Sequence, residues 1–235
     1  MYIDWTYIVL VLPAMLFAMW ASARVNSTFE KYKKTRNVRG MTGADAARWV
    51  LDRNGLRNVR IEHIQGSLTD HYDPSANVVR LSDDVYSSTS TAAIGVACHE
   101  VGHAIQHATN YAPVKIRTAI VPITNIGAKL SVPLIIIGLL LSSMGEIFVM
   151  IAYIGCALFG LVTVFQLVTL PVEINASRRA LAAIGQTHML DEDEYGMAKK
   201  TLTAAAMTYV AALAVSLAQL LRLLLIFGGR NRDDR

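Results

Sequence analysis

Four long stretches of the chain are nearly free of charged residues. They cover residues 5–22, 124–144, 147–170 and 203–227. Each is about as long as a helix that crosses a bilayer, which needs roughly 20 apolar residues. The pattern predicts a mainly α-helical membrane protein with about four transmembrane helices, the second and third joined as a hairpin over residues 124–170.

Two polar segments lie between these stretches, at residues 24–115 and 171–202. In the first, Thr42 followed by GADAARWVLDRNGL is typical of a capped helix that ends at Gly55. The runs NVRIEHI and NVVRLS show the β-branched alternation of short strands, and the turn-rich segment SLTDHYDPSAN separates them. Residues 24–115 are therefore predicted to form one small α+β domain.

Capping and breaking residues predict three more helices. One is expected from about Ser90 to Asn110, because Pro113 follows closely. Pro171 is expected to open a new helix that Gly185 ends, since proline is well tolerated in a first turn. The acidic run DEDEYG is expected to begin the last helix, where negative charge complements the helix dipole.

Composition agrees with a membrane protein and indicates its orientation. Apolar residues make up 53% of the chain and charged residues 17%, whereas soluble domains are roughly a quarter charged. Basic residues follow the first apolar stretch and lie between the third and fourth, so the positive-inside rule places both polar segments in the cytoplasm. The net charge of +4 fits this topology and anionic lipid better than nucleic acid.

The first apolar stretch invites comparison with a secretory signal, because WASAR resembles a cleavage site. The residues before it, MYIDW, are acidic rather than basic, which favours an uncleaved anchor.

The two cysteines, Cys98 and Cys156, do not suggest a disulfide framework. We expect Cys98 to be a small buried residue rather than a metal ligand.

Residues 99–103, HEVGH, lie on the helix predicted to begin near Ser90. Histidines four residues apart share one helical face and can converge on a tetrahedral Zn2+, with the intervening glutamate within reach of a water molecule. The pattern predicts His99 and His103 as zinc ligands and Glu100 as a general base. The alternative is a chance match, against which Gly102 argues, because glycine inside a helix costs up to about 1 kcal/mol relative to alanine.

A catalytic zinc site of this kind needs a third protein ligand. His107 is a poor candidate because it lies about 12 Å along the helix axis from His99, so we expect it to be an interfacial or outer residue. Glu173 directly follows the third apolar stretch, and its carboxylate would complete a two-histidine, one-glutamate site. The other interpretation of Glu173 is a helix-start glutamate that complements the dipole.

Four motifs together resemble a known family. LTDHYDP, VVRLS, ACHEVGHAIQHA and LPVEINASRRAL look like segments of the YugP-like neutral zinc metallopeptidases, a bacterial membrane family, and the likeness covers nearly the whole chain. The resemblance implies a zincin-like cytoplasmic domain in which His99 and His103 bind zinc. Glu100 would act as the base and Glu173 as the third ligand, as in the membrane gluzincins.

Two positions depart from the pattern of the family and its larger relatives. Asn175 stands where relatives often have aspartate, and Ser177 stands where the larger gluzincins carry an aspartate that orients a histidine. Residues that orient metal ligands matter for affinity. Unless Ser177 or Asn175 fills that role, the orienting residue is one that the motifs do not identify.

The leading prediction is a multi-pass zinc metalloendopeptidase of the bacterial plasma membrane, with its active site on the cytoplasmic side. It would cut membrane or membrane-proximal proteins. Its expected partners are a polypeptide substrate and the lipid bilayer, while the oligomeric state is not predicted. Two alternatives stay open: an intramembrane site-2-type protease, for which Asp191 is the nearest aspartate, and a non-catalytic zinc-binding scaffold.

Smaller hypotheses concern the segment from Asp70 to Ser82. The residues DHYD suggest either a second metal or, more simply, a turn with local hydrogen bonds. His71 or Tyr72 is a candidate oxyanion donor. NVVRLS is a candidate edge strand that would pair with an extended substrate.

Overall fold

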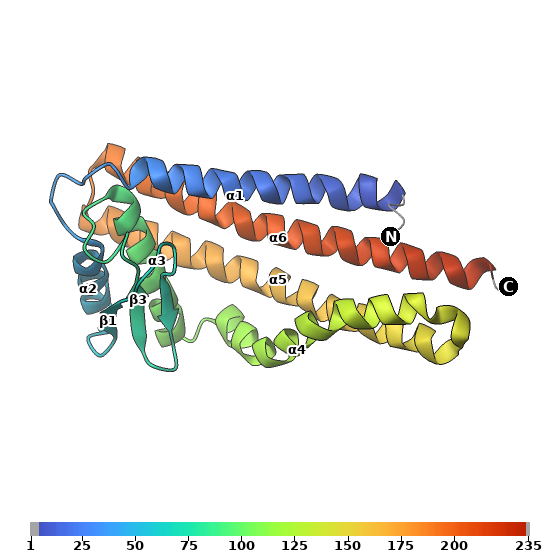
Figure 1. The fold of residues 1–235 in the computed structure, drawn as a ribbon. Coiled ribbons are helices and arrows are strands. Elements are labelled where there is room, and N and C mark those ends of the chain that lie inside the picture. The colour runs from blue at the N-terminus through green and yellow to red at the C-terminus, as the bar shows by residue number, and fades with distance from the viewer. Residues whose placement is uncertain (1–4, 234–235) are drawn as a thin grey trace. The chain divides into compact units, whose positions relative to one another are not determined.

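The computed structural model describes residues 5–233, with side chains described as far as residue 226. The elements in chain order are a π-helix Tyr7–Val11, α1 Leu12–Tyr32, α2 Gly43–Arg53, β1 Arg60–His63, β2 His71–Asp73, β3 Val78–Leu81, α3 Thr91–Ala108, α4 Ala112–Leu140, a 3-10 turn Ser142–Met144, α5 Glu146–Thr187 and α6 Glu192–Asp233 (Figure 1). Two compact units are present, and each is described by itself. The apolar unit comprises Met1–Trp20, Ile116–Leu170 and Tyr209–Arg235; the polar unit comprises Ala21–Lys115 and Pro171–Thr208.

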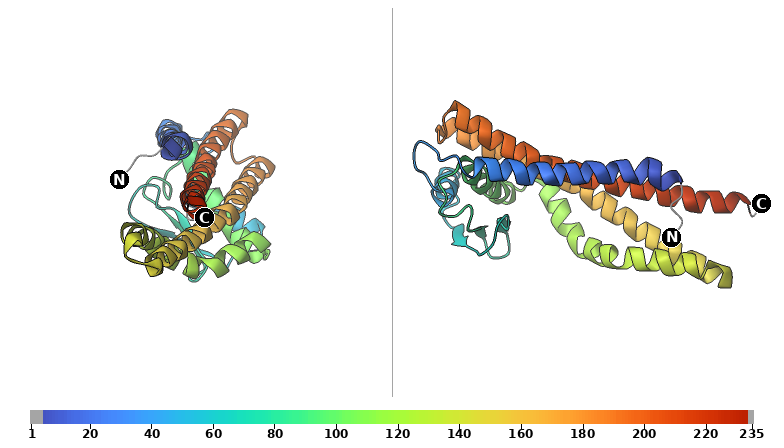
Figure 2. Two further views of the ribbon diagram at one scale, coloured as in Figure 1. Left: turned by 90° about the vertical axis from the view of Figure 1, so that its right-hand side faces the viewer. Right: turned by 45° about the horizontal axis from the view of Figure 1, so that its top comes forward.

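Four helices are long and apolar enough to cross a membrane, as the sequence predicted. They are Tyr7–Tyr32, Ala112–Leu140, Glu146–Thr187 and Glu192–Ile226. Large apolar side chains point outward along them, for example Leu140 at 74% exposed and Leu167 at 57%. Apolar surface of this extent is unusual on a soluble protein. In the apolar unit, α4 and the first part of α5 pack closely as the predicted hairpin, joined by the 3-10 turn Ser142–Met144 (Figure 2).

The predicted start of a new helix at Pro171 is wrong. Pro171 lies inside α5, which runs unbroken to Thr187. An interior proline removes a backbone hydrogen bond and costs about 3 kcal/mol, so packing must hold the chain helical here. Val172 and Ala176, on either side of the next turn, are both completely buried in the polar unit. Their burial supplies the stabilisation that the sequence pattern could not reveal.

The polar unit contains a three-stranded sheet in the order β1-β3-β2. β1 pairs with β3 in parallel, and β2 pairs with β3 antiparallel. The sequence predicted β1 and β3 but treated β2 as part of a turn. The edge-strand hypothesis for β3 is wrong, because β3 is paired on both sides. Its apolar residues explain the central place: Val78, Val79 and Leu81 are completely buried, whereas β2 is polar.

Helices α2 and α3 begin where their caps predict. Thr42 and Asp45 form a reciprocal capping box at the start of α2, and the Ser90 hydroxyl accepts a hydrogen bond from the backbone N–H of Ala93 at the start of α3. α2 and the sheet both contact α3 (Figure 1). Small residues line much of α3, including the buried Ala93 and Ala97. α3 is therefore the central helix of the polar unit.

Candidate metal centre

The two histidines of HEVGH lie together on one face of α3. The ring centroids of His99 and His103 are 4.8 Å apart, and the rings meet nearly at right angles. Each side chain is only 13% exposed. The four-residue spacing on a helix therefore produces the convergence that the sequence predicted.

Helix α5 places Glu173 opposite these histidines. Its Oε2 lies 3.3 Å from His99 Nε2 and 3.4 Å from His103 Nε2, and its side chain is 3% exposed. Among the described residues, these three form the one group of histidine, cysteine and carboxylate side chains close enough to hold a metal ion, with all donor atoms within 4.8 Å of one another. The structure thus brings the three predicted ligands together.

Glu173 is not a helix-start residue, which removes the macrodipole interpretation. α5 begins at Glu146, and the effect of the dipole on a charge fades beyond the first turn of a helix. A carboxylate buried in a helix interior is costly unless another group compensates it. The two imidazoles opposite Glu173 are the compensating groups in this structure.

Gly102 allows α3 and α5 to approach closely enough for these contacts. A Cβ atom at residue 102 would lie 2.6 Å from the backbone oxygen of Ala176 and 3.1 Å from its Cα. Backbone atoms cannot move aside as a flexible side chain can. The glycine inside the motif helix is therefore a requirement of helix packing, which accounts for the propensity cost noted in the sequence.

We expect Gly102→Ala to separate α3 from α5 and weaken metal binding. Overpacking typically costs about 1–3 kcal/mol, which exceeds the gain of up to about 1 kcal/mol from alanine's helix propensity. Thermal unfolding of the metal-free protein and a zinc titration would measure the two effects. Gly196→Ala is the matched control because a Cβ there meets nothing within 4 Å. Equal stability and zinc affinity in parent and Gly102→Ala would contradict the packing argument.

The outward-facing nitrogen of each histidine has a hydrogen-bond partner. His99 Nδ1 lies 3.1 Å from Ser177 Oγ, and His103 Nδ1 lies 3.0 Å from Gln106 Oε1. Ser177 thus fills one of the orienting roles that the sequence left open. Partners of this kind set the orientation and tautomer of a ligating imidazole.

Gln106 is the orienting residue that the motifs did not identify. It is completely buried, and its Nε2 donates to the carbonyl of Val172 at 2.7 Å and to Asn175 Oδ1 at 3.0 Å. Because Nε2 faces two acceptors, Oε1 must accept from His103 Nδ1–H. Asn175 also accepts from Arg179 Nε at 2.8 Å. Gln106 lies three residues after His103 on the same helix face, and this spacing is the signal that sequence analysis could have used.

Gln106→Leu should lower zinc affinity by about 10–100-fold, the usual effect of removing such a partner. The substitution introduces an apolar side chain of similar size and leaves His103 Nδ1–H and the Val172 carbonyl without their partner. Competition with a zinc chelator would measure the affinity. Gln65→Leu, at an exposed position, controls for loss of an amide, and an affinity equal to the parent's in Gln106→Leu would refute the assigned role.

Two of the three separations between donor atoms fit a tetrahedral metal ion. Ligands on a tetrahedral zinc with bonds of about 2.0–2.1 Å lie about 3.3–3.4 Å apart, which matches the two Nε2–Oε2 separations of 3.3 and 3.4 Å. His103 donates its Nδ1 proton to Gln106, so its Nε2 can face a carboxylate favourably only with a proton or a metal ion between them. The arrangement therefore favours a cation at this point.

The pKa shifts agree with that electrostatic picture. Burial by itself would raise the pKa of Glu173, which follows the apolar stretch 147–170, but the two imidazoles opposite it lower it well below its ordinary value. Burial would lower the pKa of His103, but the neighbouring Glu173 carboxylate and the charge of Glu100 raise it overall. Both shifts follow from the short distances between the buried carboxylate and the imidazoles.

Comparison with known proteins identifies the family. Residues 7–228 match the model of a family described as "Putative neutral zinc metallopeptidase". The chain belongs to this family. It is 45% identical over 228 residues to "Putative membrane protease YugP" of Bacillus subtilis (strain 168), which covers 97% of this chain and 99% of that protein. No solved structure matches the chain.

Glu100 lies next to His99 on α3 and is 8% exposed. It is outside the three-residue group. Asp70 is its acidic neighbour: burial raises the pKa of Asp70, hydrogen bonds from the Ser82 N–H and hydroxyl lower it in part, and the charge of Glu100 raises it further. Glu100 therefore lies in a small, enclosed acidic region beside the histidines.

The DHYD segment forms a strand and a turn. Asp73 accepts hydrogen bonds from the backbone N–H groups of Ser75 and Ala76, and from Arg80 at 2.8 Å. Tyr72 donates its hydroxyl proton to Asn77 Oδ1 at 3.1 Å. These contacts confirm the interpretation of the segment as a turn with local hydrogen bonds. The residues directly before the turn also form β2. The oxyanion role of His71 or Tyr72 stays a prediction.

Three other sequence candidates lie outside the group formed by His99, His103 and Glu173. His107 packs its ring against Tyr72, with centroids 5.4 Å apart, as expected of an outer residue. Cys98 is completely buried, which raises the pKa of its thiol to about 12 and keeps it protonated. Asp191 accepts a hydrogen bond from the backbone of Glu194 and so caps α6.

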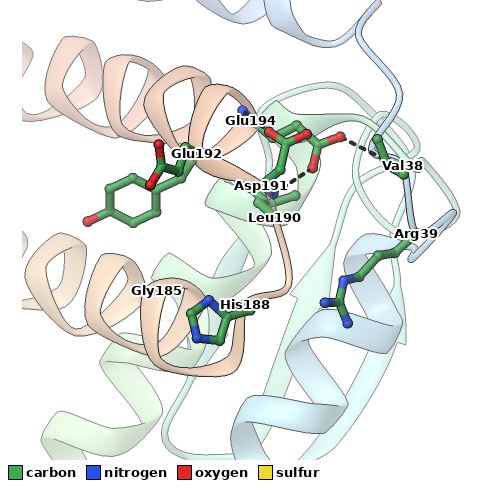
Figure 3. Close-up of a pocket in the computed structure, with 9 residues that line it drawn as sticks. Val38, Arg39, Gly185, His188, Leu190, Asp191, Glu192 and Glu194 are labelled. Atoms are coloured by element: carbon green, nitrogen blue, oxygen red, sulfur yellow. Dashed lines mark hydrogen bonds between the residues drawn. The ribbon is translucent and has the colours of Figure 1, made fainter.

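A separate cavity of about 820 Å3 lies at the connection between α5 and α6 (Figure 3). The Glu194 carboxylate lines this cavity and accepts hydrogen bonds from the backbone N–H groups of Val38 and Asp191 at 2.7 and 3.0 Å. His188 and Arg39 also line it. None of its lining residues belongs to the group of His99, His103 and Glu173, so this cavity is not the candidate centre.

Proposed function

We propose that the protein is a zinc-dependent metalloendopeptidase in which His99, His103 and Glu173 hold Zn2+. The observation that carries the proposal is the convergence of two Nε2 atoms on one buried carboxylate oxygen at tetrahedral ligand spacing. Membership of a family named for zinc peptidases supports it. Three protein ligands leave a fourth position open, as catalytic rather than structural zinc sites do.

Zinc bound there would supply Lewis-acid activation of a water molecule and of the scissile carbonyl. Glu100 accepts a proton on its carboxylate as the water oxygen forms its bond to the carbonyl carbon. Glu100 then gives that proton to the amine nitrogen as the carbon–nitrogen bond breaks. Ser177 and Gln106 hold the two imidazoles in orientation throughout.

We further propose that the chain is a multi-pass membrane protein with this site on the cytoplasmic side. The four long apolar helices and the basic residues that follow the first of them support this orientation. Substrates would then be membrane proteins or membrane-proximal segments. In intact cells, the new thiol of Ser143→Cys should react with an impermeant thiol reagent. The new thiol of Ser67→Cys should react only after permeabilisation. The reverse pattern would overturn the orientation.

Metal removal tests the function directly. Purified protein in lipid vesicles should cut a co-reconstituted membrane-protein substrate, lose that activity on treatment with a zinc chelator, and regain it when Zn2+ is restored. Fragment analysis by mass spectrometry and the zinc content per chain provide the measurements. Cleavage that continues in the metal-free protein would overturn the proposal, and so would full zinc loading with no cleavage of any tested polypeptide.

A further inference from the structure

A second cavity in the polar unit, of about 630 Å3, lies between the end of α1 and the beginning of α6. We call it the basic cavity. On α1, the residues that line the cavity have the helical spacing i, i+3, i+4 and i+7. Those on α6 have the same spacing, so each helix contributes one face. The residues that line it are Arg24, Ser27, Thr28, Lys31, Tyr32, Gly196, Lys199, Lys200, Thr203, Ala204 and Met207.

Four basic side chains line the basic cavity, and none of its lining residues is acidic. Lys31, Lys199 and Lys200 are exposed, and none of the ion pairs recorded in the described part of the chain includes them. Lys31 Nζ instead lies over the Tyr32 ring, 5.4 Å from its centroid. Like charges gathered around one space repel, so an anion there would be stabilised.

The basic cavity has room for a ligand and hydroxyl groups to bind it. A Cβ atom at Gly196 would meet nothing within 4 Å, so the glycine leaves open space in the wall. Thr28 and Thr203 supply side-chain hydroxyls beside the basic groups. Phosphate oxygens accept hydrogen bonds from lysine, arginine and hydroxyl donors, which makes a phosphate group the best chemical match.

The sequence around the basic cavity changes from polar to apolar at both walls. Arg24 follows the apolar stretch 5–22, while Thr203 begins the apolar stretch 203–227. Ala204 and Met207 add apolar wall next to the lysines. An occupant with a phosphate at one end and hydrocarbon at the other satisfies both parts of the wall, whereas free phosphate satisfies only one.

We propose that the basic cavity binds the headgroup of an anionic phospholipid. The inference rests on the membrane location given under Proposed function and not on the zinc chemistry. Basic clusters just cytoplasmic of a transmembrane helix attract anionic lipid, and each basic side chain contributes about a fivefold factor in affinity. Lipid bound there would bridge α1 and α6 within the polar unit.

Native mass spectrometry of the full chain in detergent tests the proposal. The parent should retain phosphatidylglycerol in preference to phosphatidylcholine with the same acyl chains. Lys199→Gln with Lys200→Gln should weaken that retention by about 25-fold, two fivefold factors multiplied. Gly196→Leu should also block binding, because it fills the space without changing charge. Lys34→Gln with Arg36→Gln removes the same charge at exposed positions outside the cavity and should retain the lipid.

Each alternative result overturns the proposal. Equal retention of the two lipids by the parent would exclude a selective site, and unchanged retention in both cavity variants would place it elsewhere. Thermal stabilisation of the parent by inorganic phosphate alone, absent in the lysine variant, would assign the cavity to a free anion. A chain that binds no zinc or cuts no substrate would leave the lipid count unaltered, so failure of the proposed function stays distinguishable.

Discussion

Replacing Glu100 with glutamine should abolish peptide hydrolysis while the zinc content stays at the parent's level. Glutamine has nearly the shape of glutamate, but its amide cannot accept the proton of the attacking water at neutral pH. Loss of a general base typically lowers a rate by about 10²–10⁴-fold. Initial rates of substrate cleavage and zinc per chain, measured on the same preparation, would give both quantities.

Glu192→Gln is the matched control for this experiment, because Glu192 is exposed in the first turn of α6 and lies outside the metal-binding group. It should retain the parent's rate. Cleavage at the parent's rate by Glu100→Gln would show that the base is another residue. Loss of zinc together with activity would instead show that Glu100 holds the metal.

Removing the Glu173 carboxylate should empty the metal site. Glu173→Ala deletes one of three donors, and the cavity that remains is enclosed by α3 and α5, where Glu173 is 3% exposed. Zinc affinity should fall by more than the roughly 100-fold seen when a supporting residue is lost. Because a ligand stabilises the folded state that binds it, zinc should raise the melting temperature of the parent and not of the variant.

Glu146→Ala provides the control on the same helix. Glu146 occupies the first turn of α5, where a carboxylate contributes through the helix dipole alone, about 0.3–1 kcal/mol. Its loss should leave zinc affinity and turnover unchanged. If Glu173→Ala kept both zinc and activity, the proposed ligand set and the chemistry built on it would be refuted.

Local signals in the sequence predicted the helices well. Thr42 and Ser90 are the N-cap residues of α2 and α3, and the acidic run after Leu190 lies at the start of α6. Caps act through hydrogen bonds to backbone groups two or three residues away. The apolar stretches likewise depend only on composition along one segment, so four long apolar helices could be predicted without tertiary contacts.

Local signals failed where packing outweighed them. Proline is a common first residue of a helix, yet α5 continues through Pro171 because Val172 and its neighbours are buried. β2 consists of polar residues that show no strand alternation, and it forms because β3 offers a partner edge. The central place of β3 is likewise a property of three strands together, which no single strand encodes.

The sequence by itself determined the facing pair His99 and His103, because the period of an α-helix sets that geometry within five residues. It also determined that Glu100 stands between them. Only the tertiary structure decided that Glu173 faces this pair and that Val172 and Asn175 accept hydrogen bonds from Gln106. Those contacts require two distant helices to approach where Gly102 meets Ala176, and an approach of two helices depends on the fit of both surfaces at once.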